Sequence, residues 1–181
     1  MKVLHIIPSM EIGGAQKLLS DLLPLQMKQA EVTLLVFKSV KNALVDKLVE
    51  AGVKVISLEV KNVYNTLIVF KLKKYIEGYD VVHVHLFPAL YWVAFASRRV
   101  KGKLIYTEHS TSNSRRGKRW LLPLERMVYG KYSEVVSISP QTQTALNGWL
   151  GRECSREVIL NGIDVEAFAE AASDVQPSDS I

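Results

Sequence analysis

The stretch VLHIIPSMEIGGAQKLL, residues Val3–Leu19, contains an apolar run, a glycine pair and the start of an apolar stripe. Residues Val3–Ile7 are typical of a strand that is buried on both faces. After the pair Gly13-Gly14, apolar residues recur at positions 15, 18, 19, 22 and 23, which is the spacing of one helix face. The stretch therefore predicts a buried strand joined to an amphipathic helix by a glycine-containing turn.

The same strand–helix alternation continues along the chain and predicts an α/β fold. Further strands are expected at Val32–Phe37, Val53–Val60, Val81–Leu86, Leu104–Thr107, Val135–Ile138 and Val158–Leu160, and helices at Asn42–Ala51, Thr66–Ile76, Ala89–Arg99, Lys118–Tyr132 and Pro140–Leu150. This spacing indicates a Rossmann-like parallel β-sheet with helices on both faces. Composition changes at Val165, so we expect one domain over residues 1–164 and a linker or stub over 165–181.

Composition is that of an ordinary globular domain and restricts the kinds of site. Of the 181 residues, 48% are hydrophobic and 23% are charged. The single cysteine, Cys154, excludes an internal disulfide framework and a cysteine-cluster metal site. The longest apolar run, Ala89–Ala96, is too short to cross a bilayer. We expect no signal peptide and a cytoplasmic location.

The segment from Arg98 to Arg119 is strongly basic. It holds eight Lys or Arg residues and one acid, Glu108, in a chain of net charge +5. The segment is either a solvated face or a basic patch for phosphate-bearing ligands or for an anionic membrane at its inner face. No recognition motif accompanies the charge, so nucleic acid is not an expected partner.

Polar groups follow several strands of the expected sheet, at the edge where parallel α/β sheets bind ligands. The pair Gly13-Gly14 opens a helix, whose free amides suit a phosphate, and glycine permits close approach and unusual backbone angles. A tight turn remains the alternative. The fingerprint G-x-G-x-x-G is absent, Lys38 ends the second strand in place of a ribose-binding acid, and no P-loop lysine follows the glycines. Dehydrogenase and P-loop functions are therefore disfavoured.

Three histidines also lie at this edge. His83 and His85 alternate along one strand and share a face, and we expect His83 to be a hydrogen-bonded core residue. No third ligand accompanies the H-x-H pattern at convincing spacing, so we expect no metal site. His109 directly follows a strand beside Glu108, where a neutral imidazole could bind a sugar hydroxyl or stabilise a transition state.

Five segments in order, VLHIIPSMEIGGAQKLLSDL, DVVHVHLF, KLIYTEHS, EVVSISP and VILNGIDVEAF, resemble the N-terminal domain of family-4 retaining glycosyltransferases of GT-B architecture. The resemblance implies that Gly13, Gly14 and Ala15 face the phosphates of a nucleotide-sugar donor. It implies that His109 is catalytic and contacts the donor sugar. The residues implied to line the cleft on the acceptor side are His85, Phe87, Glu108, Ser110, Arg115, Arg116, Ser139 and Asn161. It implies no metal and no cofactor beyond the nucleotide-sugar co-substrate.

The resemblance implies a domain that helps move a sugar from a nucleotide-sugar donor to a glycan or lipid-linked acceptor, in cell-surface polysaccharide or glycolipid synthesis. The family's second domain, with its Glu-x7-Glu motif, is not in these residues, so we expect the chain alone to be inactive. Gln29-Ala30 replaces the family's Gly-His, and Pro24 interrupts the first helix. A non-catalytic module that binds a phosphorylated or sugar ligand, and an epimerase acting on a nucleotide sugar, remain alternatives.

Overall fold

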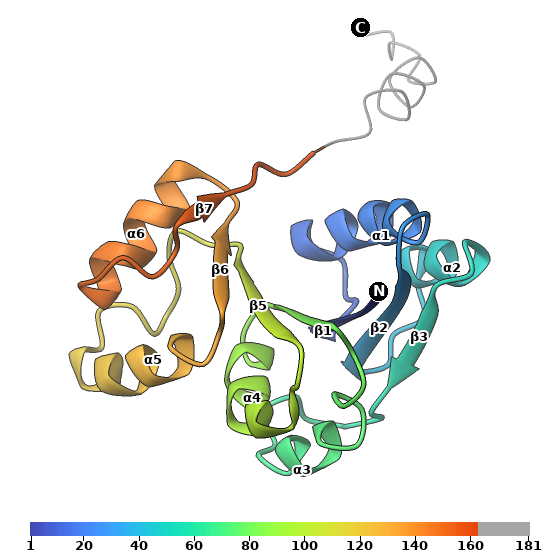
Figure 1. The fold of residues 1–181 in the computed structure, drawn as a ribbon, viewed down its shortest axis with the longest axis horizontal. Coiled ribbons are helices and arrows are strands. Elements are labelled where there is room, and N and C mark those ends of the chain that lie inside the picture. Colours follow the sequence, from blue (N-terminus) through green and yellow to red (C-terminus); the bar gives the residue numbers. More distant parts are fainter. Residues whose placement is uncertain (163–181) are drawn as a thin grey trace, which may run out of the picture.

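Seven parallel strands form one sheet in a computed structural model, which describes residues 1–162 (Figure 1). The strand order is β3-β2-β1-β4-β5-β6-β7, so the direction of winding reverses between β1 and β4. This arrangement confirms the expected Rossmann-like sheet. The expected domain boundary at residue 164, and with it Ile163, Asp164 and Phe168, lies outside the described residues.

All seven expected strands are present, with small shifts at their ends. They are β1 (Lys2–Ser9), β2 (Glu31–Lys38), β3 (Lys54–Ser57), β4 (Val81–His85), β5 (Lys103–Glu108), β6 (Glu134–Ser137) and β7 (Glu157–Val158). The helices are α1 (Gly14–Gln26), α2 (Ala43–Glu50), α3 (Ile68–Leu72), α4 (Ala89–Ala96), α5 (Leu122–Tyr129) and α6 (Pro140–Leu150). Short 3-10 turns occupy Ser97–Arg99 and Arg119–Leu121.

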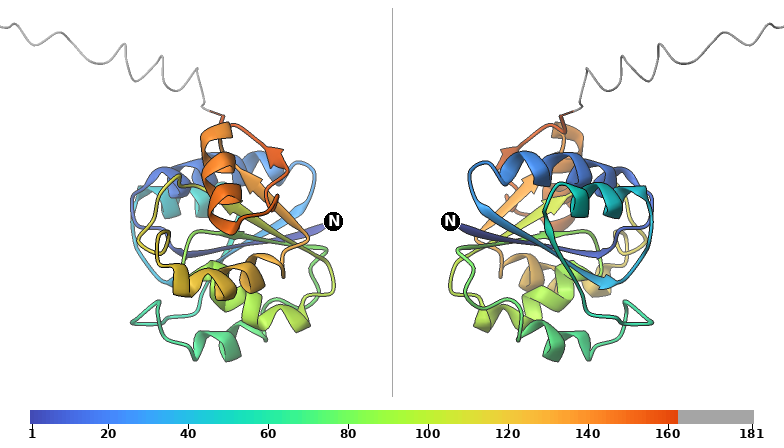
Figure 2. Two further views of the ribbon diagram at one scale, coloured as in Figure 1. Left: turned by 90° about the vertical axis from the view of Figure 1, so that its left-hand side faces the viewer. Right: turned by 90° about the vertical axis from the view of Figure 1, so that its right-hand side faces the viewer.

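Helices cover both faces of the sheet and divide the core into two parts (Figure 2). On one face, Leu19 and Leu23 of α1 and Leu48 of α2 pack against β2. On the other face, residues of α3, α4 and α5 pack against β1, β4 and β5. Since both faces are covered, the central strands are apolar along almost their whole length, as the continuous hydrophobic runs predicted.

Three helices, α3, α4 and α5, are shorter than expected: α3 ends at Leu72 and not at Ile76, and α4 ends at Ala96, before the 3-10 turn Ser97–Arg99. In α3 and α5, turns with other hydrogen bonds replace the expected first turn. The Oδ1 atoms of Asn62 and Asn65 accept from the amides of Tyr64 and Leu67, each at 2.9 Å, so this segment forms turns until Ile68. The segment that begins at Lys118 enters through a 3-10 turn, and α5 then starts at Leu122 with a proline in its first turn.

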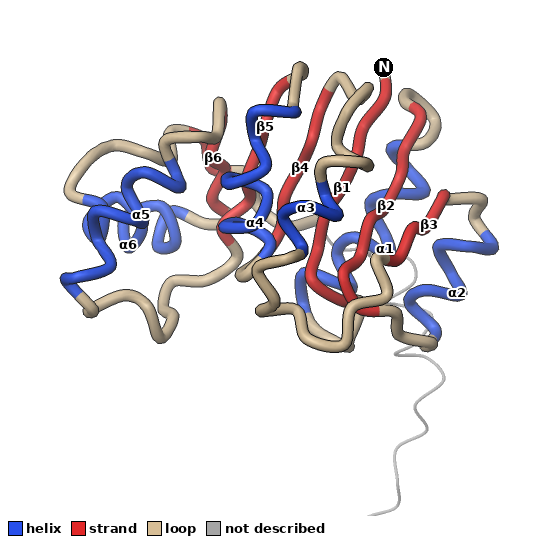
Figure 3. Tube along the Cα trace, turned by 90° about the horizontal axis from the view of Figure 1, so that it is seen from below, coloured by secondary structure: helices blue, strands red, loops and turns tan. Residues whose placement is uncertain are grey.

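The parallel sheet brings the carboxyl ends of its strands to one edge (Figure 3). The loops after β1 and β4 meet at this edge, at the point where the strand order reverses. Ligand sites of open α/β sheets form at such a point. Within residues 1–162, no helix is long and apolar enough to span a bilayer.

Candidate functional site

A cleft of about 420 Å³ opens at the carboxyl edge, between the loops that follow β1, β3 and β4. Its walls carry apolar, aromatic, neutral polar, basic and acidic side chains, and are formed by Pro8, Ser9, Glu11, Gln16, Lys38, Lys61, Asn62, Val63, Tyr64, Leu86, Phe87 and Pro88. Phe87 is the only cleft residue that was expected to contact an acceptor, and its ring centroid lies 5.8 Å from that of Tyr64. Sequence reasoning missed Lys61 and Tyr64 because they lie in a loop without periodicity.

The glycine pair leaves an open surface at the first turn of α1. The amides of Gly14, Ala15 and Gln16 donate to no protein acceptor among residues 1–162, and the N-cap residue Gly13 offers no side chain. A Cβ on Gly14 would meet no atom within 4 Å, so a ligand can approach this backbone closely. Gly13 has an extended φ of −177° and Gly14 has no positive φ, so neither glycine uses the unusual backbone angles that glycine permits. Ala15 is buried in the core and contributes only its amide.

His85 and His109 meet at the adjacent strand ends, and His5 continues the contact inward. His85 Nδ1 lies 3.2 Å from His109 Nε2, and His85 Nε2 lies 3.1 Å from His5 Nδ1. His5 Nε2 in turn lies 2.8 Å from Oε1 of Gln26 at the end of α1. His85 is only 2% exposed, and neither His85 nor His109 is among the residues that line the cleft.

Burial keeps these imidazoles neutral at physiological pH. It lowers the pKa of His5 to about 4, although the hydrogen bond to Gln26 Oε1 opposes the shift, and it lowers the pKa of His109 to about 4. Burial, together with the neighbouring histidines, also holds the pKa of His85 well below its usual value. His109 is therefore able to act as a neutral hydrogen-bonding group at the end of β5.

The structure brings a third histidine to the H-x-H pair, because His5 pairs in register with His83 across β1 and β4. The nearest ring nitrogens of His5, His83 and His85 lie within 4.8 Å of one another. However, the rings of His5 and His85 are tilted by only 12°, with centroids 5.4 Å apart, so their facing nitrogens point at each other. A zinc ion about 2.0–2.1 Å from each nitrogen needs lone pairs that converge on the ion, so these rings would have to turn.

His83 is hydrogen-bonded within the sheet, as expected. Its Nε2 lies 2.7 Å from Thr107 Oγ1 on β5. The chain's four histidines therefore gather around β1, β4 and β5, and three of them form a continuous hydrogen-bonded series.

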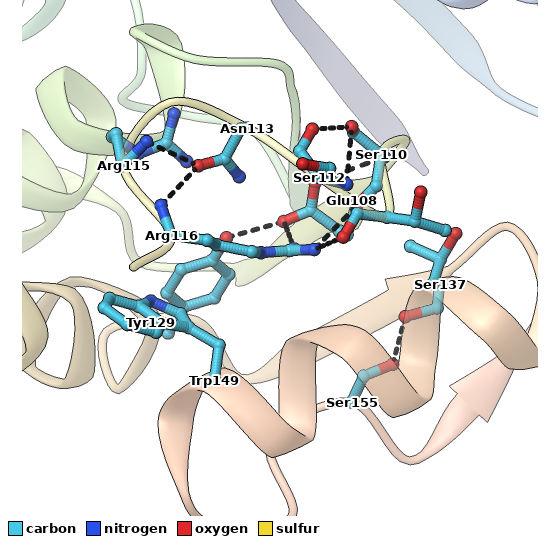
Figure 4. A network of polar contacts seen from close by, with 12 residues as sticks. Glu108, Ser110, Ser112, Asn113, Arg115, Arg116, Tyr129, Ser137, Trp149 and Ser155 are labelled. Atoms are coloured by element: carbon cyan, nitrogen blue, oxygen red, sulfur yellow. Dashed lines mark hydrogen bonds and ion pairs between the residues drawn. The ribbon is translucent and has the colours of Figure 1, made fainter. Parts of the chain in front are cut away.

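Glu108 is 3% exposed and organises the loop that follows β5 (Figure 4). Tyr129 donates to its Oε2 at 2.6 Å, and the Ser110 amide donates to its Oε1 at 3.3 Å. Arg116 Nη2 lies 3.1 Å from Oε2, which is an ion-pair distance without hydrogen-bond geometry at that nitrogen. Burial raises the pKa of Glu108, although Tyr129 and Arg116 oppose the shift. Glu108 and Arg116 thus hold this loop in place, and neither charge is free for a ligand.

Arg115 joins the same loop to α5 and to the cleft. Its Nε donates to Oε1 of Glu125 at 2.8 Å, and its guanidinium carbon lies 4.3 Å from the centroid of the Phe87 ring. Glu125 is 1% exposed and also accepts from the Tyr91 hydroxyl and from Trp149 Nε1. Arg115 therefore forms the back of the wall that carries Phe87.

The two remaining expected cleft residues lie elsewhere along the edge. Ser139 caps α6, where its Oγ accepts from the amide of Thr142 at 3.1 Å, as the Ser-Pro sequence predicted. Asn161 is exposed near the end of the described chain. Neither residue lines the cleft between the loops after β1 and β4.

Comparisons with known proteins agree on the family and on the fold. A model of Glycosyltransferase Family 4 matches residues 12–167. HepE of Anabaena, solved in complex with UDP and glucose, superposes with a TM-score of 0.74 at 24% identity, over 92% of this chain and 46% of HepE. Sucrose-phosphate synthase of Thermosynechococcus elongatus superposes with a TM-score of 0.57 at 13% identity, over 97% of this chain and 53% of that enzyme. The chain thus spans about half the length of both structures. No curated protein matches it.

Proposed function

The chain belongs to Glycosyltransferase Family 4, with the fold of the Rossmann-like half of a GT-B enzyme, and we propose that it forms the acceptor side of a retaining glycosyltransferase. In this role it helps move a sugar, a hexose or a related one, from a nucleotide-sugar donor to a glycan or lipid-linked acceptor. Cell-surface polysaccharide or glycolipid synthesis in the cytoplasm is the setting that we propose.

The observation that carries the proposal is a neutral His109 at the carboxyl end of β5. Burial lowers the pKa of His109 to about 4, and its Nε2 is occupied by His85. Its Nδ1 has no hydrogen-bond partner among residues 1–162 and can therefore bind a ligand. A fixed, neutral group placed near the reacting sugar can stabilise a transition state without reorganising at each turnover.

The donor side of the proposal rests on α1 and on HepE. Structures of HepE contain UDP and UDP-glucose, and we propose that this chain meets a nucleotide sugar of the same kind. The free amides in the first turn of α1 suit its phosphates, because they add to the positive end of the helix dipole. No acidic side chain in that turn opposes an anion.

The acceptor side of the proposal rests on the cleft at the strand reversal. Phe87 and Tyr64 offer apolar ring faces, and Lys61 offers positive charge, whereas Lys38 is paired with Glu11 at 2.9 Å. A sugar with an anionic or lipid-linked group would use both kinds of contact. Since the chain covers about half of HepE, we propose that it transfers sugar weakly or not at all without a second half.

The test is nucleotide release by the protein encoded by the full reading frame. Nucleoside diphosphate release from a panel of nucleotide sugars should rise when the correct acceptor is added. The substitution His109→Ala should lower the rate by about 100-fold or more, which is typical of losing one preorganised contact. An unchanged rate would remove His109 from the site.

Three further measurements separate the finer parts of the proposal. The anomeric configuration of the product decides whether transfer retains configuration. Product analysis also separates transfer from epimerisation. Rapid turnover by residues 1–181 alone would contradict the proposed dependence on a second half.

A surface beside α5 supports peripheral contact with an anionic membrane. Trp120 is 76% exposed and directly follows the cationic residues Lys118 and Arg119, which are exposed as well. An exposed indole next to basic side chains suits the headgroup region of such a membrane. Co-sedimentation with vesicles that contain anionic lipid should exceed that with neutral vesicles. Trp120→Ala should weaken it, and equal binding to both vesicle types would refute this contact.

A further inference from the structure

The hydrogen-bonded series of Gln26, His5, His85 and His109 has a definite direction. A neutral imidazole carries one proton, so one of its nitrogens donates and the other accepts. When neutral imidazoles form a row, the donor or acceptor at one end therefore determines the proton position on every ring. Gln26 is the end of this row opposite His109.

The proton positions follow from the Gln26 amide oxygen, which faces His5 Nε2 at 2.8 Å. An oxygen only accepts, so His5 carries its proton on Nε2 and leaves Nδ1 as an acceptor. His85 must then donate from Nε2 across 3.1 Å, which leaves its Nδ1 to accept. His109 must in turn donate from Nε2 across 3.2 Å. The final lone pair therefore lies on Nδ1 of His109.

The ring geometry supports hydrogen bonds at each step. The 5.4 Å centroid separation of His5 and His85, with a tilt of 12°, is that of two rings meeting edge to edge. His85 and His109 have a similar separation of 5.5 Å with a larger tilt of 50°. One proton fits between each facing pair of nitrogens.

We propose that Gln26 is a positioning residue that acts through His5 and His85 to fix the tautomer of His109, with Nδ1 as an acceptor toward the ligand. Gln26 itself lies at the end of α1 and touches no part of the cleft. The ligand group at His109 must then be a hydrogen-bond donor, such as a hydroxyl. A phosphate oxygen only accepts hydrogen bonds at neutral pH, so the lone pair on Nδ1 of His109 would repel it.

The experiment reads the histidine tautomers directly by long-range ¹H–¹⁵N NMR of the 181-residue chain, without substrate. The chain has four histidines, so one substitution of each assigns every signal. Protonated and unprotonated ring nitrogens have well-separated ¹⁵N shifts. In the unaltered chain, we expect the proton of His109 on Nε2. A proton on Nδ1 would overturn the proposal.

Two substitutions of Gln26 test the direction of the series. Gln26→Lys places a donor-only group beside His5, so every ring should reverse and His109 should carry its proton on Nδ1. Gln26→Met removes the acceptor, so His109 should populate both tautomers, and this variant decides if the lysine variant does not fold. Gln29→Met is the matched control, because Gln29 is exposed three residues further along. Unchanged His109 shifts in the folded Gln26 variants would overturn the proposal.

The inference depends on the proposed function only where it assigns Nδ1 to a ligand hydroxyl. The tautomer measurement needs no donor, acceptor or turnover. If the tautomers reverse in Gln26→Lys but the protein transfers no sugar, the series stands and the glycosyltransferase proposal fails. If sugar transfer depends on His109 but the tautomers do not change in the Gln26 variants, the glycosyltransferase proposal stands and the role of Gln26 fails.

Discussion

The buried pair of Arg115 and Glu125 allows a quantitative prediction about stability. The side chains are 12% and 1% exposed, and they lie 2.8 Å apart. Arg115→Met keeps most of the aliphatic stem but removes the guanidinium, and with it the charge that compensates Glu125 and the contact with the Phe87 ring. Breaking a buried ion pair from one side costs about 3–5 kcal/mol, because the remaining charge stays buried without its partner. For a domain of this size, that loss lowers the melting temperature by about 6–20 °C.

The assay is urea unfolding followed by tryptophan fluorescence, since Trp149 donates to Glu125 at 3.3 Å. Arg99→Met is the matched control. It makes the same substitution in an ion pair with Glu77 at 3.0 Å, whose side chains are 59% and 48% exposed. An exposed pair contributes about 0–1 kcal/mol. If the two variants lose the same free energy of unfolding, the reasoning from burial is refuted.

Glu125→Gln tests whether charge, and not the hydrogen bonds, determines that loss. In the background of Arg115→Met it removes the uncompensated charge while an amide keeps some contacts to Tyr91 and Trp149. The double variant should therefore be more stable than Arg115→Met alone. A double variant that is less stable by the sum of both single losses would show that the two residues act independently.

Three more perturbations follow from the structure. The pKa of His5 falls from 6.5 unfolded to about 4 folded, so the unfolded chain binds more protons between these values, and stability is lost as pH falls through this window. His5 alone should contribute about 2 kcal/mol to the loss between pH 7.5 and pH 5, so His5→Gln should lose about that much less than the unaltered chain, by urea unfolding. Asn42→Ala removes the cap of α2 and its 2.7 Å bond to the Met10 carbonyl, and should cost about 1–2 kcal/mol; a change below about 0.3 kcal/mol would contradict this role. Gly14→Ala should keep the free energy of unfolding within about 1 kcal/mol while raising the KM for the nucleotide sugar, and an unchanged KM would argue against phosphate contact there.

The strands were predictable because burial on both faces produces continuous apolar runs. Val32–Phe37, for example, lies wholly within β2. Helix ends were less predictable where side chains compete with the backbone, as the two asparagines before α3 do. Alternation of strands and helices predicts a parallel sheet, but it does not predict strand order.

The strand order explains why part of the site was not predicted. Alternation along β4 places His83 and His85 on one face, but only the adjacency of β1 and β4 brings His5 beside them. The ion pairs of Arg115 and Arg116 likewise could not be predicted from the sequence, because their loop has no periodicity. Their carboxylate partners were selected by tertiary packing of β5 and α5.

The gathering of all four histidines inside the fold has an electrical consequence. Burial lowers the pKa of His5 and His109 to about 4 and holds the pKa of His83 and His85 well below the usual value. The formal charge of +5 with neutral histidines thus persists in the folded chain down to roughly pH 5. Unfolding in mild acid adds up to four charges. Between about pH 7 and pH 5, where exposed histidines titrate, the net charge of the native molecule therefore changes little. Its attraction to anionic surfaces should stay almost the same across that range.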